Sequence, residues 1–162
     1  MNLPAPAFER KIRPPETLAR GIAGVRRPLV FTNGVFDILH RGHVTCLAQA
    51  RTLGSALVVA LNGDASAKRL GKGDDRPINP LADRAAVIAA LDAVDFVTWF
   101  DDDTPLALID LLCPDVLVKG GDWAVDRIVG ASGVLARGGR VMSIPFEHER
   151  STTRLLERIR SA

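Results

Sequence analysis

Five short apolar runs, each closed by turn or polar residues, constrain the fold of this chain more than any other feature. They occupy residues 28–34 (PLVFTNG), 56–64 (ALVVALNGD), 95–100 (DFVTWF), 115–121 (DVLVKGG) and 139–146 (GRVMSIPF). The second run begins with six consecutive apolar residues, which is typical of a parallel strand covered on both faces. We therefore predict five strands in a mainly parallel sheet.

Helix-forming segments lie between these runs. They are residues 16–25, 43–54 with Gly54 as the C-terminal stop, 65–70, 81–94, 104–113 and 151–160. Strands that alternate with helices predict an α/β fold of the Rossmann-like, doubly wound kind, with helices on both faces of the sheet. A chain of 162 residues suits one such domain. We assign residues 1–27 to an N-terminal arm with a short helix, and residues 28–162 to the functional domain.

Composition excludes several classes of protein. The 21 basic and 19 acidic residues nearly balance, and no basic stripe with interleaved aromatic residues is present, so we expect no nucleic-acid partner. No apolar run reaches the length of a membrane span, and the proline-rich, charged start lacks the apolar stretch of a signal peptide. Cys46 and Cys113 have no pairing or ligand spacing, so we expect small core residues in a reducing, cytoplasmic protein.

Polar clusters follow three of the predicted strands. They are residues 33–43 (NGVFDILHRGH), 119–123 (KGGDW) and 147–154 (EHERSTTR). In an open parallel sheet, ligands bind beyond the carboxyl ends of the strands, near the point where the strand order reverses. We therefore expect the three clusters to form one site at one edge of the sheet.

The first cluster holds two of the three histidines of the chain, His40 and His43. Four interpretations are open: a metal site, a base beside a nucleophile, a structural pair at a helix start, and a phosphate clamp. Zinc needs three or four ligands, and Asp37 is the only further candidate nearby. A nucleophile needs an activated thiol or hydroxyl, and Cys46 falls one turn inside the predicted helix, facing the core.

The phosphate interpretation accounts for more residues at once. A helix that begins near Arg41 directs unpaired N–H groups and a positive dipole end at a ligand above the strand. Gly34 and Gly42 allow the backbone to approach that ligand closely. The imidazoles of His40 and His43 would then donate to phosphate oxygens as charge develops during phosphoryl or nucleotidyl transfer.

The run TNGVFDILHRGH resembles the HxGH nucleotidyltransferase superfamily, and its cytidylyltransferase-like branch in particular. The later segment STTR resembles the second motif of that branch, although Glu149 and Arg150 replace the glycine and apolar residue that are usual before it. The likeness covers about residues 28–160 and includes VVALNGDASAKRL, RPINPLADR, DDDTPLALI, DVLVKGGDW and GRVMSIPF.

This resemblance implies transfer of AMP from ATP to D-glycero-D-manno-heptose 1-phosphate, with the β anomer favoured. The products would be pyrophosphate and ADP-heptose for the inner core of lipopolysaccharide. Magnesium is expected with the triphosphate, and a homo-oligomer, preferably a dimer, is expected from relatives. Two alternatives are kept: a cytidylyltransferase for glycerol 3-phosphate or another small alcohol phosphate, and a non-catalytic nucleotide-binding module.

The resemblance also implies the roles of individual residues. His40, His43 and Lys68 are the expected catalytic residues. The expected nucleotide-binding residues come from the three clusters: Thr32, Asn33, Gly34, Val35, Phe36, Gly42, Lys119, Gly120, Gly121, Asp122, Trp123, Ser151, Thr152 and Thr153. The expected substrate-binding residues are Asp37, Lys68, Lys72, Arg76 and Arg84.

Several of these residues have an ordinary structural alternative. Ser151, Thr152 and Thr153 would equally cap a helix, and the cations would equally be solvated surface charges. Trp123 would flank the base or cover the core. Asp37 would contact sugar hydroxyls or hold magnesium through water.

Overall fold

The computed structural model contains one sheet of five parallel strands, in the order β3-β2-β1-β4-β5. It describes residues 4–71, 73, 75–146, 155, 156, 158, 159 and 161. The strands are β1 (Leu29–Gly34), β2 (Ala56–Asn62), β3 (Phe96–Phe100), β4 (Val116–Gly120) and β5 (Arg140–Ile144). All five predicted strands and the doubly wound α/β class are confirmed.

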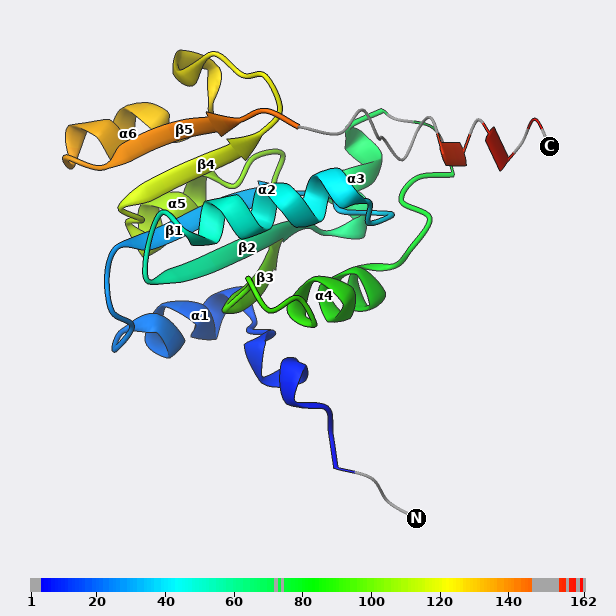
Figure 1. The fold of residues 1–162 in the computed structure, drawn as a ribbon, viewed down its shortest axis with the longest axis horizontal. Coiled ribbons are helices and arrows are strands. Elements are labelled where there is room, and N and C mark those ends of the chain that lie inside the picture. Colours follow the sequence, from blue (N-terminus) through cyan, green and yellow to red (C-terminus); the bar gives the residue numbers. More distant parts are fainter. Residues whose placement is uncertain are drawn as a thin grey trace.

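Helices cover both faces of the sheet (Figure 1). They are α1 (Pro15–Ile22), α2 (Arg41–Arg51), α3 (Asp64–Arg69), α4 (Leu81–Ala89), α5 (Leu106–Leu112) and α6 (Ala131–Ala136), with 3₁₀ turns η1 (Ala7–Lys11) and η2 (Val125–Arg127). Buried side chains of α1, α5 and α6 form the core on one face, and those of α2 and α4 form the core on the other. Among the described residues, no helix is long and apolar enough to cross a membrane.

The central strands carry apolar side chains on both faces of the sheet. Every residue of β2 is buried, because helices cover both faces of the sheet there. Neighbouring side chains of a strand enter opposite cores, so Phe31 packs with α1 and α5, whereas Val30 packs with α2. An apolar run without polar alternation is therefore what this position requires.

Helix α6 was not predicted from the sequence. It is six residues long, contains Gly133 and ends beside Gly138 and Gly139, so its helical signal is weak. Two adjacent parallel strands nevertheless need a crossover on one face of the sheet. Helix α6 makes that crossover between β4 and β5, and Val134 anchors it in the core.

The described part of the N-terminal arm packs against the domain. Ile12 pairs with Val97 of β3 in a parallel bridge, and the Arg13 N–H donates to the Val97 carbonyl at 2.8 Å. Leu18, on α1, is fully buried in the core. The helix predicted at residues 16–25 is α1, which begins one residue earlier and ends three residues earlier. The arm is thus held to the sheet by both backbone pairing and apolar burial.

Two sequence expectations at helix ends need correction. Helix α2 ends at Arg51 with Thr52 as its C-cap, so Gly54 does not stop the helix directly. Gly54 is instead needed for close packing, because a Cβ there would lie 2.4 Å from the Pro28 carbonyl oxygen. Cys113 was expected in the core but is exposed, because it is the left-handed C-cap of α5, whereas Cys46 is buried as expected.

The strand order reverses between β1 and β4, which places their carboxyl ends at the centre of one sheet edge. The loops after β2 and β3 lie to one side of this point, and those after β4 and β5 lie to the other. Parallel α/β sheets open a crevice at such a point.

We predict that Leu18→Ala lowers the free energy of unfolding by about 2–4 kcal/mol, because it leaves a cavity beneath α1. Urea denaturation monitored by circular dichroism measures the change.

Leu111→Ala is the matched control, since that leucine is 55% exposed on α5 and its truncation should change stability by less than about 0.5 kcal/mol. Equal losses in the two variants would show that α1 is not part of the core.

Candidate active site

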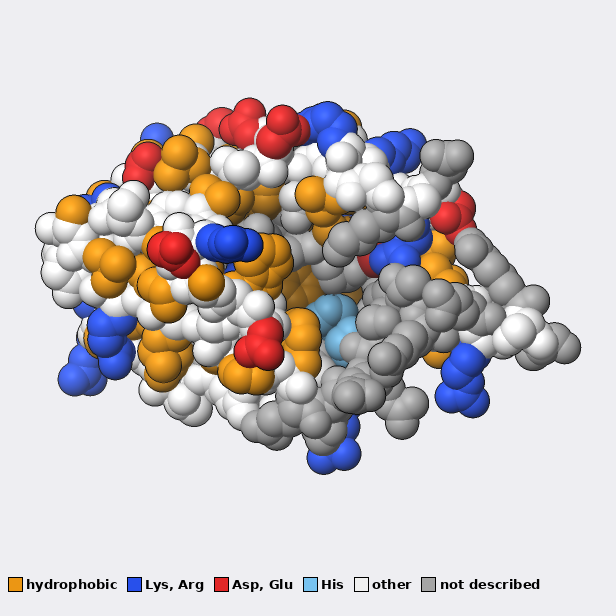
Figure 2. Space-filling model, turned by 90° about the horizontal axis from the view of Figure 1, so that it is seen from above, with side chains coloured by type: hydrophobic (Ala, Val, Ile, Leu, Met, Phe, Trp, Pro, Cys, Tyr) orange, Lys and Arg blue, Asp and Glu red, His pale blue; other side chains and the backbone are white. Residues whose placement is uncertain are grey.

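A cavity of about 540 Å³ opens at the carboxyl edge of the sheet, where the strand order reverses. Figure 2 shows this hollow with histidine side chains at its floor. The loop after β1, the first turns of α2, the ends of β2 and β4, the β3–α5 loop and η2 provide its walls. Its lining residues are Thr32, Asn33, Gly34, Val35, Phe36, Asp37, His40, His43, Cys46, Leu47, Asn62, Leu70, Arg76, Asp103, Thr104, Pro105, Lys119, Gly120, Gly121, Trp123, Arg127, Ile128, Val129 and Phe146.

The two imidazoles form one stacked unit in this cavity. Their ring centroids are 3.7 Å apart and their planes are inclined by 22°. The ring of Phe36 meets His43 edge-on at 5.1 Å, and Phe146 lies 6.4 Å from His40 and 6.1 Å from His43. The two imidazoles thus stack on one another and meet aromatic rings edge-on, and both line the cavity.

His40 is also the N-cap residue of α2, just before the helix begins at Arg41. Its backbone is extended, and its carbonyl accepts the N–H groups of His43 at 3.0 Å and Val44 at 3.3 Å. The N-terminus of an 11-residue helix, with N–H groups that have no partner inside the helix, therefore lies beside the imidazoles. The buried Nδ1 of His40 has no hydrogen-bond partner among the described residues. This arrangement favours an anionic ligand.

Protonation states limit the chemistry of the site. Burial lowers the pKa of His40 below its usual 6.5, so the free protein holds this ring neutral at neutral pH. Burial raises the pKa of the Cys46 thiol to about 11, so it does not supply a thiolate nucleophile. Within the described ranges, no group of three His, Cys, Asp or Glu side chains could hold a metal ion. The protonated thiol does not fit the interpretation of a base beside a nucleophile, and the role of the pair as a phosphate clamp stays a prediction.

The loop between β1 and α2 reaches its shape through Gly34 and Phe36. Phe36 has φ of +48°, a left-handed conformation that is uncommon for a bulky residue. This turn brings its ring back over Gly34, where a Cβ would lie 2.9 Å from the ring, and onto His43. Gly34 is therefore needed for the close approach of Phe36.

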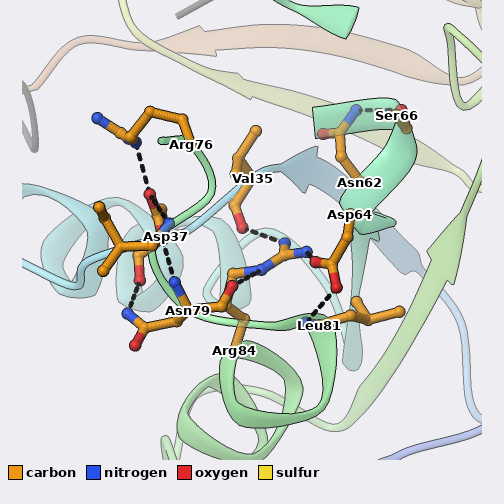
Figure 3. A network of polar contacts seen from close by, with 10 residues as sticks. Val35, Asp37, Asn62, Asp64, Ser66, Arg76, Asn79, Leu81 and Arg84 are labelled. Atoms are coloured by element: carbon orange, nitrogen blue, oxygen red, sulfur yellow. Dashed lines mark hydrogen bonds and ion pairs between the residues drawn. The ribbon is translucent and has the colours of Figure 1, made fainter. Parts of the chain in front are cut away.

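Arg84 corrects a sequence expectation. We expected this arginine to reach a substrate phosphate, but its side chain is fully buried and bonded within the protein (Figure 3). It donates to the Val35 carbonyl at 2.7 Å, to Asp64 Oδ1 at 2.7 Å and to the Asn79 carbonyl at 3.0 Å. Arg84 thus joins the β1–α2 loop, the loop before α4 and the start of α3, next to residues that line the cavity.

Asp37 has a similar structural role, which differs from the expected contact with sugar or magnesium. Its side chain is 1% exposed, and its carboxylate accepts bonds from Arg76 Nε at 2.6 Å, Ile78 N at 3.0 Å and Asn79 N at 2.9 Å. The Asp37 carbonyl also accepts from Asn79 Nδ2 at 2.6 Å. These bonds hold the loop before α4 against the β1–α2 loop and leave the carboxylate little capacity for a ligand.

Arg76 remains a candidate for binding phosphate. Its Nε is held by Asp37, and the other end of its guanidinium points away from that carboxylate in Figure 3. Arg76 lines the cavity, whereas Lys68 is exposed on α3 and is not among the lining residues. The predicted phosphate contacts of Arg76 and Lys68 stay predictions.

The carboxyl end of β4 and residues just after it line the cavity. Lys119, Gly120, Gly121 and Trp123 line it, and Lys119 Nζ lies 3.3 Å from Asn33 Oδ1 and 5.8 Å from the centre of the Trp123 ring. Trp123 is 48% exposed, which rules out the alternative in which it covers the core.

Not every expected residue falls at the cavity. Gly42 is buried in α2 and Asp122 is exposed, and neither lines the cavity. Four of the expected binding residues lie outside the described residues, namely Lys72, Ser151, Thr152 and Thr153, and so do Glu149, Arg150 and Arg154.

The sequence analysis missed the wall formed by the end of β2, the β3–α5 loop and η2. Its polar members are Asn62, Asp103, Thr104 and Arg127. Asn62 lies near the carboxyl end of the predicted run at residues 56–64, and Thr104 follows the run at residues 95–100, so their position at the carboxyl edge was a signal that we did not use. Arg127 had no comparable signal, because η2 was not predicted.

A doubly wound parallel sheet with stacked imidazoles and a helix N-terminus at its switch point defines a nucleotidyltransferase-type α/β domain. The model of the family described as cytidylyltransferase-like matches residues 31–158, and the chain belongs to this family of nucleotidyltransferases. The sequence-based assignment to the cytidylyltransferase-like branch is thereby confirmed.

Relatives with known names support this membership. The chain is 57% identical over 155 residues to the D-beta-D-heptose 1-phosphate adenylyltransferase of Bordetella bronchiseptica, covering 94% of this chain and 96% of that protein. It is 46% identical over 172 residues to the bifunctional protein HldE of Hahella chejuensis, covering 98% of this chain but only 36% of that protein. The chain thus spans about a third of the bifunctional relative.

Solved structures share the fold. The lipopolysaccharide core biosynthesis protein of Thermoplasma volcanium matches with a TM-score of 0.60 and 29% identity, covering 75% of this chain and 98% of that one. The pantoate-beta-alanine ligase of Francisella tularensis matches with a TM-score of 0.58 and 12% identity, covering 88% of this chain and 68% of that one, and supports the fold alone.

We predict that the ring of His40 titrates with a midpoint below pH 6.5 in the free protein, because burial disfavours its charged form. The unfolded chain then binds this proton more readily, so acidification through pH 6.5 favours unfolding. Proton NMR of the histidine rings measures the midpoint.

In the His40→Gln variant, the resonance of the His40 ring is missing from the spectrum, which identifies it in the wild-type protein. The same variant should lose the decrease in stability that protonation of His40 causes below pH 6.5. A midpoint above 6.5 would show that the ring is charged in the free cavity.

Proposed function

We propose that this chain transfers AMP from ATP to D-glycero-D-manno-heptose 1-phosphate, with the β anomer as its substrate. The 57% identity to a named heptose 1-phosphate adenylyltransferase, over nearly the full length of both chains, carries this proposal. The cavity adds chemical support, because it unites the imidazoles of His40 and His43 with a helix N-terminus. The ADP-heptose that forms would serve the synthesis of the lipopolysaccharide inner core.

The reaction requires little acid–base chemistry from the protein. An oxygen of the sugar 1-phosphate, already ionised at neutral pH, attacks the α-phosphorus of ATP. The new P–O bond forms as the bond to the β-phosphate oxygen breaks, and pyrophosphate leaves with the electron pair. Catalysis then consists of holding the two phosphates in line and stabilising the charge of the transition state.

His40 and His43 are proposed to provide that stabilisation. In the proposed complex, both rings donate hydrogen bonds to the non-bridging oxygens of the α-phosphate, beside the first N–H groups of α2. The two rings stack at 3.7 Å between centroids and both line the cavity, which supports the proposal that they act on one phosphate together. Donors aimed at developing charge lower the barrier more than they strengthen ground-state binding.

The remaining contacts follow from the lining residues. Backbone N–H groups of residues 33–35 would meet the nucleotide phosphates, and the strand end at residues 119–121 would contact the base with Trp123 beside it. Ser151, Thr152 and Thr153 keep their proposed role at the β- and γ-phosphates, and Lys68, Lys72 and Arg76 their role at the sugar phosphate.

Magnesium is proposed to enter with the triphosphate. Of the two carboxylates that line the cavity, Asp37 is bonded within the chain and Asp103 pairs with Arg69 at 2.6 Å. The described residues therefore do not form a dedicated magnesium site, which is usual for an ion held mainly by phosphates and water. Cytoplasmic location and a homodimer are further proposals, to be checked by cell fractionation and by light scattering.

We predict that His40→Ala and His43→Ala each lower kcat by about 100-fold or more, with a smaller change in the KM for ATP, because each removes a donor to the transition state. Steady-state pyrophosphate release measures both constants.

Circular dichroism verifies that each variant is folded. Normal turnover in both folded variants would refute the assigned roles.

A substrate panel tests the proposed reaction itself. We expect pyrophosphate release with ATP and the β anomer of heptose 1-phosphate, and slow release when CTP or glycerol 3-phosphate replaces either substrate. Mass spectrometry should identify the product as ADP-heptose.

Turnover with CTP and glycerol 3-phosphate alone would assign the cytidylyltransferase activity instead. Tight nucleotide binding without turnover of any pair would indicate a non-catalytic module.

A further inference from the structure

Strand β2 ends in Asn62, a buried amide at the wall of the cavity for which neither the motifs nor the proposed reaction provides a role. The residue is 5% exposed and lines the cavity at the carboxyl edge of the sheet, one strand away from the loop that leads to the histidines. A buried amide has donors and acceptors to satisfy, so its hydrogen bonds indicate what it presents to a ligand.

The hydrogen bonds of Ser66 determine which way this amide faces. The Ser66 hydroxyl donates to the Asp102 carbonyl at 2.8 Å, and that carbonyl can only accept. A hydroxyl has one hydrogen, so Ser66 Oγ presents lone pairs to Asn62 and accepts from its Nδ2 at 3.0 Å. The Asn62 amide nitrogen is therefore directed at Ser66, and its oxygen is directed away from Ser66.

Figure 3 shows this orientation. The Asn62 oxygen points away from Ser66, toward the side of the view where Val35 lies, and Val35 also lines the cavity. No described residue donates a hydrogen bond to that oxygen in the structure. Ser66 is 2% exposed, so water has little access to compete for the bond that orients the amide. The relay from Asp102 through Ser66 thus presents a fixed acceptor at this wall.

A fixed acceptor selects the chemistry of its partner. Phosphate oxygens at neutral pH are predominantly acceptors and would be repelled by the amide oxygen. A hydroxyl donates, and it suits the position well. The Asp102 carbonyl that accepts from Ser66 belongs to the β3–α5 loop. Thr104 of the same loop also lines the cavity and carries a hydroxyl. This wall is therefore suited to a polyhydroxylated group.

We propose that Asn62 is a specificity-determining residue whose side-chain oxygen accepts a hydrogen bond from a hydroxyl of the acceptor sugar, and that Ser66 positions it. The inference rests on the proposed function and names the part of the sugar phosphate that this wall recognises. The amide contacts the polyol and not the reacting phosphates.

The test compares Asn62→Leu, which has a similar volume but no polar atoms, with Asn62→Asp, which keeps an acceptor oxygen. We expect Asn62→Leu to raise the KM for heptose 1-phosphate about tenfold or more, while the KM for ATP changes less than twofold. Asn62→Asp should retain the KM for the sugar within about threefold. Ser66→Ala, which frees the amide to turn, should give a smaller rise than Asn62→Leu.

Deoxy analogues of the sugar phosphate identify the partner hydroxyl. Wild-type protein should discriminate against one analogue about tenfold or more, and Asn62→Leu should lose that discrimination. An unchanged sugar KM in Asn62→Leu, or equal rises for ATP and sugar, would overturn the inference. If Asn62→Leu does not fold, a loss of sugar recognition in Asn62→Asp would do the same.

Failure of the proposed function gives a different result. Wild-type protein would then release no pyrophosphate with heptose 1-phosphate. The same variants are in that case compared on whichever phosphorylated polyol is turned over, where hydroxyl recognition again requires a selective rise in the KM of that polyol. If the KM of that polyol does not rise selectively in Asn62→Leu, the inference is overturned whichever sugar the enzyme uses.

Discussion

The site depends on one buried guanidinium, that of Arg84. A fully buried cation is stable only when its donors are paired, and Arg84 pairs with two carbonyls and with Asp64. The carbonyls belong to Val35, before the left-handed turn at Phe36, and to Asn79, before α4. Loops from distant parts of the sequence are therefore fixed relative to one another, and Phe36 is held against His43.

Around this framework, the cavity brings the stacked imidazoles beside the N-terminus of α2. Their ring centroids lie 3.7 Å apart, and burial lowers the pKa of His40, which favours its neutral form in the free protein. Phosphates that enter would supply the charge and meet donors that need little reorganisation. Asp37 contributes by restraining Arg76 and the loop before α4, and not by offering its carboxylate to a ligand.

Most of the fold was predictable because its signals are local. The strands are five to seven residues long and rich in apolar residues, and β2, which is buried throughout, was the clearest. Helix α6 and η2 were missed because a six-residue helix with a glycine and a three-residue turn have no amphipathic period to detect. His40, His43 and the glycine-rich end of β4 were found because their spacing is itself the signal. The roles of Asp37 and Arg84 were misjudged, since a charged residue in a sequence does not reveal whether its partner lies in solvent or in the core.

The sequence alone determined the parallel α/β class, the HxGH motif and the family, because each depends on residues close together in the chain. Only the tertiary structure decided which polar groups face the cavity. Arg84 bonds to Val35 across 49 positions, and Ser66 bonds to the Asp102 carbonyl across 36 positions. Whether a polar side chain meets a ligand or another loop depends on such long-range partners, because a buried donor or acceptor must be paired wherever the fold provides a partner.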